Sequence, residues 1–406
     1  MDKREVDVAI IGAGTAGMVA YNRVRKVTDK VVLIEGDHYG TTCARVGCMP
    51  SKLLLAAADS AWQMAQADLF GVSAGKISVD GKRVMARVRS ERDRFVASVV
   101  RSVEEFPEEH RIKGHARFAR PNHLIIDNET EIHAQRIIIA TGSRPNIPGF
   151  LKEAKDRLVV NDDIFEWQDL PASVVVFGPG VIGLELGQAL SRLGVRVRMF
   201  GVGGAVGPIQ DDSIREYALK RFNEEFPLDP DGDVKRVERV DGGVAVTFTD
   251  GINGEKTETF EYLLAATGRR PNVDNLDIQN ADIELDEKGL PLFDPHSLRC
   301  GQSHIFIAGD ANNNLPLLHE AADEGRIAGN NAASYPDVRA GLRSTPLAVV
   351  FTDPQIASVG LTIDEVDKRC GGRFAVGEVS FENQGRSRVI GKNSGLLRVY
   401  GEHGSG

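Results

Sequence analysis

The chain has 406 residues, of which 42% are hydrophobic, and a formal net charge of −9. Because this length exceeds what one ordinary core serves, we expect a globular protein of roughly two to four domains. Basic residues alternate with acidic ones, as in the segment 83–94, and form no patch, so the composition disfavours a nucleic-acid partner.

The first predicted elements are a strand, a helix and a second strand. An apolar run at Val6–Ile11 leads through a glycine turn into a helical stretch at Ala16–Val27, and a second apolar run follows at Val31–Ile34. This order is typical of a βαβ unit. The first run is interrupted by Asp7 and ends too soon for a signal peptide or a membrane span. We therefore expect a soluble, cytoplasmic protein without a membrane segment.

A glycine fingerprint marks the turn of this unit. Gly12, Gly14 and Gly17 give the spacing G-x-G-x-x-G between a strand and a helix, where free backbone N–H groups and the helix dipole can hold a pyrophosphate. Glu35 ends the next strand, where a carboxylate can accept hydrogen bonds from a ribose diol. The glycines alone would suit an ordinary turn, but strand, helix and acid together favour a dinucleotide site.

Two cysteines, Cys43 and Cys48, follow this unit and enter an apolar helix. Their spacing allows the thiols to meet across one turn of distorted helix, and a helix N-terminus favours the thiolate that attacks disulfides. The cysteines of the chain are too few for a secreted disulfide scaffold, and Cys300 and Cys370 lack the spacing of two further zinc ligands. We therefore favour a redox pair over a structural disulfide and expect no metal site.

The next predicted elements are two helices and a β-ribbon. The helices span Ser51–Ala67 and Arg83–Phe106, and the second has an apolar face that we expect to serve packing. Short strands separated by turn residues follow over His115–Ala140, and the same pattern returns at Gly242–Ala266. The apolar face of the second helix comprises Val88, Phe95, Val96, Val99, Val100 and Val103.

A second βαβ unit comprises a strand at Val174–Phe177, a helix at Val181–Leu193 and a strand at Val195–Phe200. Two nucleotide-sized units are therefore predicted in one chain. The turn of the second unit repeats the glycine fingerprint at Gly178, Gly180 and Gly183.

The acid is missing from this second unit. Gly201 stands where the first unit has Glu35, so no carboxylate there selects NAD by binding the ribose 2′-hydroxyl. Arg196 and Arg198 lie nearby in the sequence, yet solvent-facing strand positions explain them at least as well as a site for a 2′-phosphate. The sequence leaves NAD and NADP both open.

A further segment begins after Gly341, with a strand at Ala348–Phe351 and a capping box at Thr362 and Glu365 that opens a helix. It is cut off at Gly406. We predict an α/β protein with two Rossmann-like nucleotide-binding domains, β-ribbon insertions and a partial α+β domain.

An ordered set of motifs carries a resemblance to a known family. From about Val6 to Gly406 the chain resembles the pyridine nucleotide-disulfide oxidoreductases, and within that family it is most similar to the dihydrolipoamide dehydrogenases. The motifs are Cys43-Ala-Arg-Val-Gly-Cys48-Met-Pro-Ser-Lys52, Ala140-Thr-Gly-Ser-Arg-Pro145, Gly178-Pro-Gly-Val-Ile-Gly-Leu-Glu185, Ala266-Thr-Gly-Arg-Arg-Pro-Asn272, Ile307-Ala-Gly-Asp310 and His319-Glu-Ala-Ala-Asp-Glu-Gly325.

The resemblance implies the catalytic residues. Cys43 would be the thiol that exchanges with substrate, and Cys48 would contact the flavin and form its charge-transfer complex. Lys52 and Glu185 would form an ion pair beside flavin N5. Two electrons would pass from a dithiol through the cysteine pair and FAD to a nicotinamide, with NAD expected and NADP not excluded.

It also implies the cofactor-binding residues. Asp310 would hold the flavin ribityl chain, and the helix that begins near His319 would point its N-terminus at the pyrimidine edge of the flavin. The other implied FAD residues are Gly12, Gly14, Gly17, Glu35, Thr42, Lys52, Thr141 and Gly142. The implied nicotinamide residues are Gly178, Gly180, Gly183 and Gly268.

The family's base for thiol exchange is a histidine in a His-Pro motif near the C-terminus, contributed by the partner subunit of a dimer. None of the nine histidines here precedes a proline. We therefore expect a truncated portion of a longer, homodimeric protein; the alternative is a chain that exchanges thiols slowly. The expected domains are FAD-binding parts at 1–150 and 273–340, a nicotinamide-binding domain at 151–272 and a truncated dimerisation domain at 341–406.

Other functions stay open. Thr41 and Arg45 stand where relatives more often have glycine and asparagine, so a related NAD(P)H-dependent disulfide reductase or a mercuric reductase is one alternative to dihydrolipoamide oxidation. Another is a flavin-bound, non-catalytic subunit of a 2-oxo acid dehydrogenase complex, although the intact cysteine pair argues against it. The expected partners are a dithiol substrate, including the lipoyl domain of such a complex, and a second copy of the chain.

Overall fold

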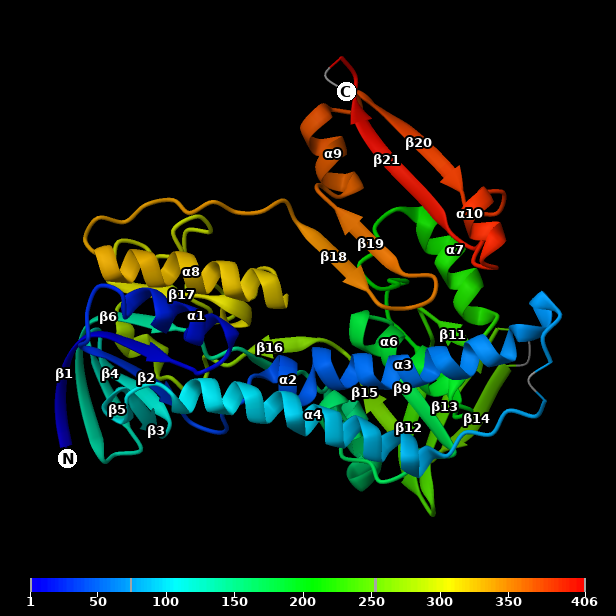
Figure 1. Ribbon diagram of the computed structural model, residues 1–406, viewed down its shortest axis with the longest axis horizontal. Coiled ribbons are helices and arrows are strands. Elements are labelled where there is room, and N and C mark those ends of the chain that lie inside the picture. The colour runs from blue at the N-terminus through cyan, green and yellow to red at the C-terminus, as the bar shows by residue number, and fades with distance from the viewer. Residues whose placement is uncertain (1, 74, 252–253, 405–406) are drawn as a thin grey trace. The chain divides into compact units, whose positions relative to one another are not determined.

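The computed structural model describes residues 2–73, 75–251 and 254–404. Within this part of the chain, no helix is both long and apolar enough to cross a lipid bilayer. The chain forms two compact units (Figure 1). Unit 1 comprises residues 1–45, 92–144 and 269–344, and unit 2 comprises residues 46–91, 145–268 and 345–406. The domain limits predicted from the sequence stay a prediction.

A mixed sheet forms the centre of unit 1. Its strand order is β3–β2–β1–β6–β5–β4, and β17 also pairs with β6. Strands β1, β2, β3, β6 and β17 run parallel, whereas β4 and β5 extend the sheet as an antiparallel ribbon. The strands are β1 (Asp2–Ile11), β2 (Val31–Glu35), β3 (Arg111–Lys113), β4 (Ala116–Arg120), β5 (His123–Ile126), β6 (Thr130–Ile139) and β17 (Ile305–Ile307).

Helices α1 (Thr15–Val24) and α8 (Leu318–Ser334) pack on one face of this sheet (Figure 1). Val8 and Ile10 point into the core that these helices share, whereas Ala9 points into the core on the opposite face. Successive residues of a strand alternate between its two faces, so a central strand that is covered on both faces is apolar throughout. The unbroken apolar run in the sequence has this cause.

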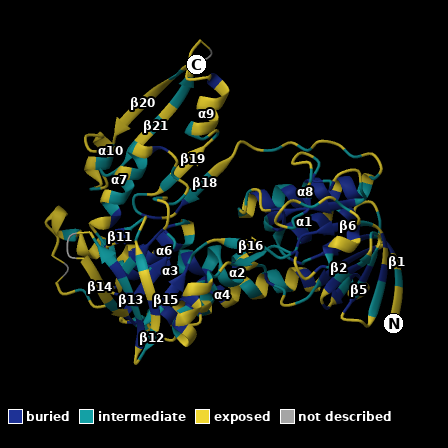
Figure 2. Ribbon diagram, turned by 180° about the vertical axis from the view of Figure 1, so that it is seen from behind, coloured by how far each residue is buried: buried dark blue, intermediate teal, exposed yellow. Residues whose placement is uncertain are grey.

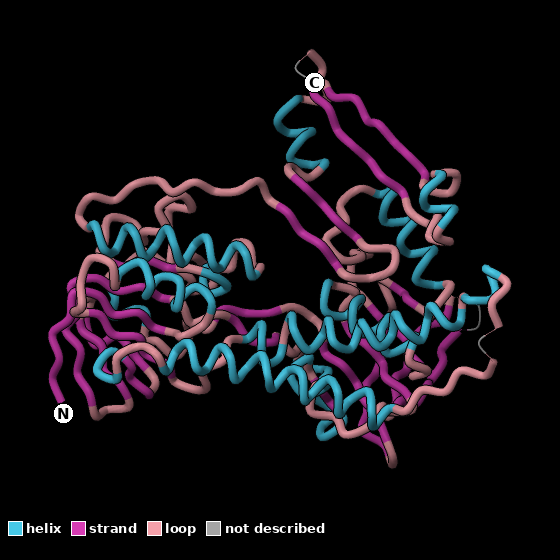
Figure 3. Tube along the Cα trace, viewed as in Figure 1, coloured by secondary structure: helices cyan, strands magenta, loops and turns pink. Residues whose placement is uncertain are grey.

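Unit 2 repeats the plan with a parallel sheet of order β11–β10–β9–β15–β8. Helices α3 and α6 pack on one face, and a three-stranded ribbon, β12–β13–β14, packs on the other (Figure 3). The elements are α3 (Cys48–Ala65), β8 (Leu158–Val159), β9 (Ser173–Phe177), α6 (Val181–Arg192), β10 (Arg196–Phe200), α7 (Asp212–Asn223), β11 (Leu228–Asp229), β12 (Val234–Val240), β13 (Gly243–Asp250), β14 (Gly254–Phe260) and β15 (Tyr262–Ala265).

The C-terminal part of unit 2 contains two antiparallel strand pairs, β18–β19 and β20–β21. Between them lies α9, whose predicted capping box is confirmed: Thr362 Oγ1 accepts a hydrogen bond from the Glu365 amide, and Glu365 Oε2 accepts one from the Thr362 amide. Figure 2 shows β20 largely exposed and β21 partly exposed, in contrast to the buried central sheets. The elements are β18 (Leu347–Val350), β19 (Ile356–Val359), α9 (Ile363–Cys370), β20 (Phe374–Ser380), α10 (Gly385–Val389) and β21 (Leu396–Glu402).

One packing expectation needs correction. The predicted second helix is α4 (Gly81–Glu104), and its apolar face is buried only toward its two ends, at Val88 and Val103, while Phe95 is 39% exposed. The division between the two units falls within α4, so its ends contribute to different cores. The predicted α/β fold class is confirmed. The remaining elements used below are α2 (Thr42–Val46), β7 (Ser143–Pro145), α5 (Asn161–Ile164), β16 (Arg269–Pro271) and the 3₁₀ helix η5 (Gly309–Asn312).

Candidate active site

The three glycines of the first turn serve different purposes. Gly12 has φ +106°, and a Cβ there would lie 2.3 Å from the carbonyl oxygen of Ala140. A Cβ at Gly17 would lie 1.8 Å from the carbonyl oxygen of Gly12, whereas a Cβ at Gly14 would meet nothing within 4 Å. The chain itself therefore requires the first and third glycines, and the second leaves open space against the backbone for a ligand.

Glu35 supports this turn. Its Oε2 accepts a hydrogen bond of 2.8 Å from the Ala13 amide, and its Oε1 accepts one of 3.1 Å from the Asp37 amide. Each carboxylate oxygen keeps a second lone pair for a ribose hydroxyl. Helix α1 begins after Gly14 without a side-chain cap, so its first amides are available to an anion.

The predicted FAD residues between β6 and β7 also fit a ligand. Thr141 Oγ1 is buried without a hydrogen-bond partner, and Gly142 has φ +68° with open space where a Cβ would stand. Asp310, in η5, accepts a 2.7 Å hydrogen bond from Ser143 Oγ, which in turn accepts one from Arg269 Nε. A buried hydroxyl without a protein partner, next to the glycine turn, is suited to a hydrogen bond with a dinucleotide.

His319 lies in the first turn of α8, with its side chain 52% exposed. Two glutamates of α8 form, with Arg343, a buried group that sequence reasoning missed. Arg343 pairs with Glu320 at 2.9 Å and with Glu324 at 2.8 Å, and Glu324 also accepts from the Gly309 amide at 2.7 Å. Burial raises the pKa of Glu324, and these partners offset that effect in part. The group ties the loop that carries the predicted flavin residues to α8.

The second glycine turn, in unit 2, has the same geometry as the first. A Cβ at Gly178 would lie 2.3 Å from the carbonyl oxygen of Ala266, and one at Gly183 would lie 2.0 Å from the carbonyl oxygen of Gly178. Gly180 again faces open space, as does Gly268, which has φ +99°. The residues present therefore fit a second dinucleotide.

The end of β10 differs from the end of β2. A Cβ at Gly201 would lie 2.5 Å from a backbone oxygen of the neighbouring loop, so a carboxylate has no room there. Arg196 and Arg198 both pair with Glu258, at 3.1 and 3.2 Å. Asp231 accepts a 2.7 Å hydrogen bond from an amide of the loop after β10. Glu258 of β14 thus engages both arginines, and the carboxylate of Asp231 lies against the loop after β10.

The two cysteines lie in consecutive helical segments. Cys43 is in α2, and Cys48 begins the 18-residue helix α3; both are half-buried. Gly47, with φ −127° and ψ −115°, breaks the helix between them. Thr41 has φ +56°, and its Oγ1 accepts a 3.2 Å hydrogen bond from the Ala44 amide. A β-branched residue is strained in this left-handed conformation, which the hydrogen bond helps to hold.

The predicted ion pair is present in unit 2. Lys52 Nζ lies 2.7 Å from Glu185 Oε2, with the lysine side chain 36% and the glutamate side chain 5% exposed. Glu185 Oε1 accepts a 3.0 Å hydrogen bond from the Phe351 amide, and Lys52 Nζ lies 4.4 Å from the centroid of the Phe351 ring. Lys52 stands four residues after Cys48, on the same side of α3.

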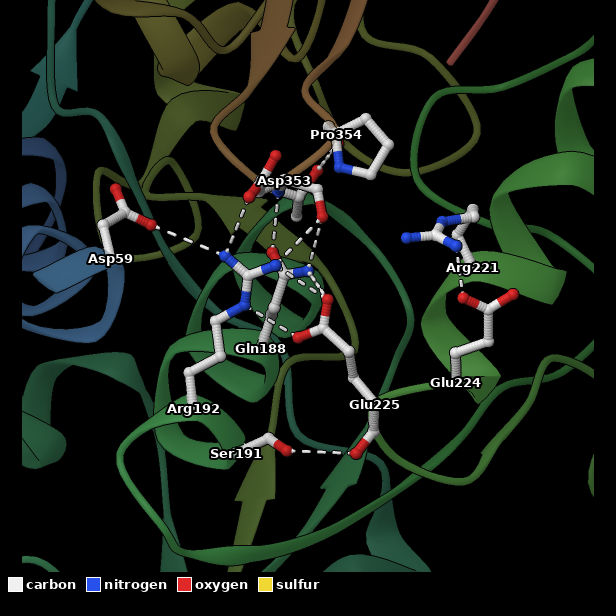
Figure 4. A network of polar contacts seen from close by, with 10 residues as sticks. Asp59, Gln188, Ser191, Arg192, Arg221, Glu224, Glu225, Asp353 and Pro354 are labelled. Carbon is white, nitrogen blue, oxygen red and sulfur yellow. Dashed lines mark hydrogen bonds and ion pairs between the residues drawn. The ribbon is translucent and has the colours of Figure 1, made fainter. Parts of the chain in front are cut away.

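The same face of α6 carries a larger polar network that sequence reasoning missed (Figure 4). Gln188 exchanges two hydrogen bonds with the backbone of Asp353, at 2.8 and 2.9 Å. Arg192, 3% exposed, pairs with Glu225 at 2.7 Å, with Asp353 at 3.2 Å and with Asp59 of α3 at 3.6 Å. The only signal in the sequence is that Gln188 and Arg192 follow Glu185 by three and seven residues.

The structure thus groups the predicted residues by unit. One predicted FAD residue, Thr42, begins α2 and is exposed. The other predicted flavin residues of unit 1 surround its glycine turn or lie in η5 and α8. Unit 2 carries Cys48, Lys52, Glu185 and the nicotinamide glycines.

Known proteins share these features. The sequence profile described as pyridine nucleotide-disulphide oxidoreductase matches residues 6–325, and the profile of that family's dimerisation domain matches residues 347–406. A dihydrolipoyl dehydrogenase of Bacillus subtilis is 30% identical over 407 residues, covering 97% of this chain and 86% of the relative. One of Halobacterium salinarum is 32% identical over 416 residues, covering 98% of this chain and 85% of the relative.

Solved structures are similar as well. LpdA from Mycobacterium tuberculosis has a TM-score of 0.81 at 25% identity, covering 99% of this chain and 88% of that one. The HOCl-induced flavoprotein disulfide reductase RclA from Escherichia coli has a TM-score of 0.80 at 22% identity, covering 98% of this chain and 86% of that one. The second similarity concerns the fold alone.

Proposed function

Because the chain belongs to the pyridine nucleotide-disulphide oxidoreductase family, we propose that it oxidises a dihydrolipoyl-type dithiol with FAD as cofactor and NAD⁺ as electron acceptor. The observation that carries this proposal is the ion pair between the buried Glu185 and Lys52, which lies on the helix that begins with Cys48. The dihydrolipoyl dehydrogenases that are about a third identical over most of their length support the choice of dithiol.

In this proposal unit 1 holds FAD. The open turn at Gly14 and the first amides of α1 receive the pyrophosphate, Glu35 binds a ribose diol, and Thr141 Oγ1 gains the hydrogen bond it lacks. Oδ2 of Asp310 accepts from Ser143, and its other carboxylate oxygen can accept a hydrogen bond from the ribityl chain. Bound FAD would supply the group that accepts two electrons from the thiols and passes them to the nicotinamide.

The cysteine pair performs the thiol exchange. One substrate thiolate attacks Sγ of Cys43 in the oxidised pair, and the Cys43–Cys48 bond breaks to release Cys48 as a thiolate. The second substrate thiolate then attacks the substrate sulfur bound to Cys43, so the product leaves as a disulfide and the pair is left reduced. The N-terminus of α3 stabilises the Cys48 thiolate, and Lys52, one turn later, adds a positive charge on the same side.

We propose NAD⁺ over NADP⁺ because of the charges around β10. The guanidinium groups of Arg196 and Arg198 are engaged by Glu258, and Asp231 places a carboxylate against the loop that follows the strand. A 2′-phosphate would meet that carboxylate, while both arginines already pair with Glu258.

We also propose that the active form is a homodimer. The dimerisation-domain profile matches residues 347–406, and apolar side chains of this segment are exposed to solvent. Such a surface is typical of an interface. The exposed side chains include Val376, Val379, Leu397 and Val399.

The test measures NADH formation from dihydrolipoamide by the flavin-loaded chain, beside NADPH- and NADH-dependent reduction of glutathione disulfide and of Hg(II). We expect the highest kcat/KM with dihydrolipoamide and NAD⁺. Cys43→Ser and Cys48→Ser should abolish turnover, whereas Cys300→Ala, a buried cysteine of unit 1, should retain it. Turnover that survives Cys48→Ser refutes the thiol mechanism, and a preference for glutathione or Hg(II) refutes the substrate.

A further inference from the structure

Three side chains with metal-ligating atoms gather on the ribbon of unit 1, on different residues from the glycine turns and the cysteine pair. His123 on β5 stands directly opposite His133 on β6 in the antiparallel register. Glu131 precedes His133 by two residues on β6 and therefore points to the same side of the sheet. Directly opposite and diagonal neighbours on one face of a sheet are within side-chain reach.

The ligand atoms converge on one oxygen. Glu131 Oε1 lies 2.5 Å from Nε2 of His123 and 3.6 Å from Nε2 of His133, and all three ligand atoms lie within 4.8 Å of one another. Ligands of a tetrahedral zinc ion are about 3.3 Å apart, given metal–ligand distances of about 2.0–2.2 Å. Shifts on the order of 1 Å would bring these atoms to that spacing.

Neighbouring side chains orient the three ligand groups. Lys3 of β1 holds Oε2 of Glu131 at 3.0 Å, which leaves Oε1 directed at the histidines. Nε2 of His123 is buried, and Glu131 Oε1 lies 2.5 Å from it, so the carboxylate is already directed at the nitrogen that would bind the ion. His133 is 44% exposed, and its ring stacks on that of His123 at 4.1 Å, so it can rotate to admit an ion and water.

We propose that His123, Glu131 and His133 bind one divalent transition-metal ion of the zinc class, with water completing the coordination. Two imidazole nitrogens and one carboxylate oxygen suit Zn²⁺, Ni²⁺ or Cu²⁺, whereas Mg²⁺ and Ca²⁺ prefer oxygen ligands alone. The ion would bridge β5 and β6, so its binding stabilises unit 1 by an amount that grows with the logarithm of the free metal concentration once that exceeds Kd.

Zinc binding to the chelator-treated, flavin-loaded chain tests this site. Cys43→Ser and Cys48→Ser are introduced first, because thiolates also bind zinc. Titration calorimetry should show one Zn²⁺ per chain and no binding of Mg²⁺. Glu131→Gln and His133→Ala should each weaken the affinity by about tenfold or more. His296→Ala, which removes an exposed histidine of the same unit, should leave it unchanged.

Thermal unfolding gives a second readout that does not depend on activity. Zn²⁺ should raise the melting temperature of the chain that carries Cys43→Ser and Cys48→Ser, and His133→Ala should remove that rise while leaving the melting temperature without metal nearly unchanged. Equal zinc affinity in Glu131→Gln, His133→Ala and the parent overturns the proposal. So does the absence of saturable binding, which would mean that the cluster shares only a proton.

Discussion

Replacing Arg192 by leucine is expected to destabilise unit 2 by about 3–5 kcal/mol. The guanidinium is 3% exposed and donates to both carboxylate oxygens of Glu225 at 2.7 Å (Figure 4). Glu225 is itself only 9% exposed, so the variant leaves a buried carboxylate without its cation. The loss also removes the ion pair of the Asp353 side chain, two residues after Phe351, whose amide binds Glu185 of the proposed active site.

Calorimetric unfolding measures this effect. At roughly 2–4 °C per kcal/mol for a unit of this size, the melting temperature should fall on the order of 10 °C. The double variant Arg192→Leu/Glu225→Leu should recover part of the loss, because it removes the buried unpaired carboxylate, while the side chains of Asp353 and Asp59 are exposed enough to be solvated. Arg221→Leu is the control, since its contact with Glu224 is exposed and should contribute less than about 1 kcal/mol. Equal melting temperatures for the two single arginine variants would refute the reasoning.

Four further outcomes follow from individual sites. Gly180→Ala should leave unfolding unchanged within about 1 kcal/mol but raise KM for the nicotinamide, because the new methyl group enters open space that the fold does not use; an unchanged KM contradicts this. Thr41→Ala should unfold at least about 1 kcal/mol more easily than Thr41→Gly, since alanine keeps the left-handed strain and loses the Oγ1 hydrogen bond; equal denaturant midpoints contradict this. Burial alone would raise the pKa of Asp211, but hydrogen bonds from the Tyr400 hydroxyl, the amide three residues on and Arg398 lower it. The stability that this carboxylate contributes is therefore present above about pH 4, the range of an unfolded aspartate, and is lost as the pH falls through the depressed folded pKa. The unfolding free energies of the native chain and of Asp211→Asn should therefore converge in acid; a difference between them that widens in acid contradicts this. Burial raises the pKa of Cys300 to about 12, so mass spectrometry after alkylation near about pH 8 should find it unmodified in the native chain; labelling at the rate of the reduced active-site pair contradicts this.

Periodicity predicted both βαβ units because their central strands are covered on two faces and their helices on one. The limits of the elements were less accurate. Helix α3 begins at Cys48, three residues before the predicted start, because Pro50 lies in the first turn, where the missing N–H costs no internal hydrogen bond. Helix α1 ends at Val24, before the predicted Val27, which is 67% exposed and so has no core to extend the helix into.

The Lys52–Glu185 ion pair could be predicted although its residues are 133 apart, because both lie in family motifs, whereas distant contacts outside any motif could not. Arg343 belongs to no motif, and only the tertiary fold brings it to Glu320 and Glu324. The histidine–glutamate cluster likewise depends on the register of β5 and β6, which spacing along the chain does not specify. The spacing of the cysteines alone predicts no metal site, because it carries no information on histidines that the sheet brings together.

The two glycine turns show how a ligand can be inferred from what the fold does not need. At Gly12 and Gly178 the backbone that follows β6 and β15, respectively, leaves no room for a Cβ, so packing requires glycine at both positions. Gly14 and Gly180 have ordinary extended backbone and open space beside them, so the fold accepts alanine at either position. Because glycine loses more conformational entropy on folding, it lowers the stability of the folded chain by about 0.5–1 kcal/mol relative to alanine. The glycine at both open positions is therefore explained by a bound molecule that approaches the backbone closely. The two turns differ in how they can bind a ribose: β2 ends in the carboxylate of Glu35, whereas β10 is followed by Gly201, which has no side chain.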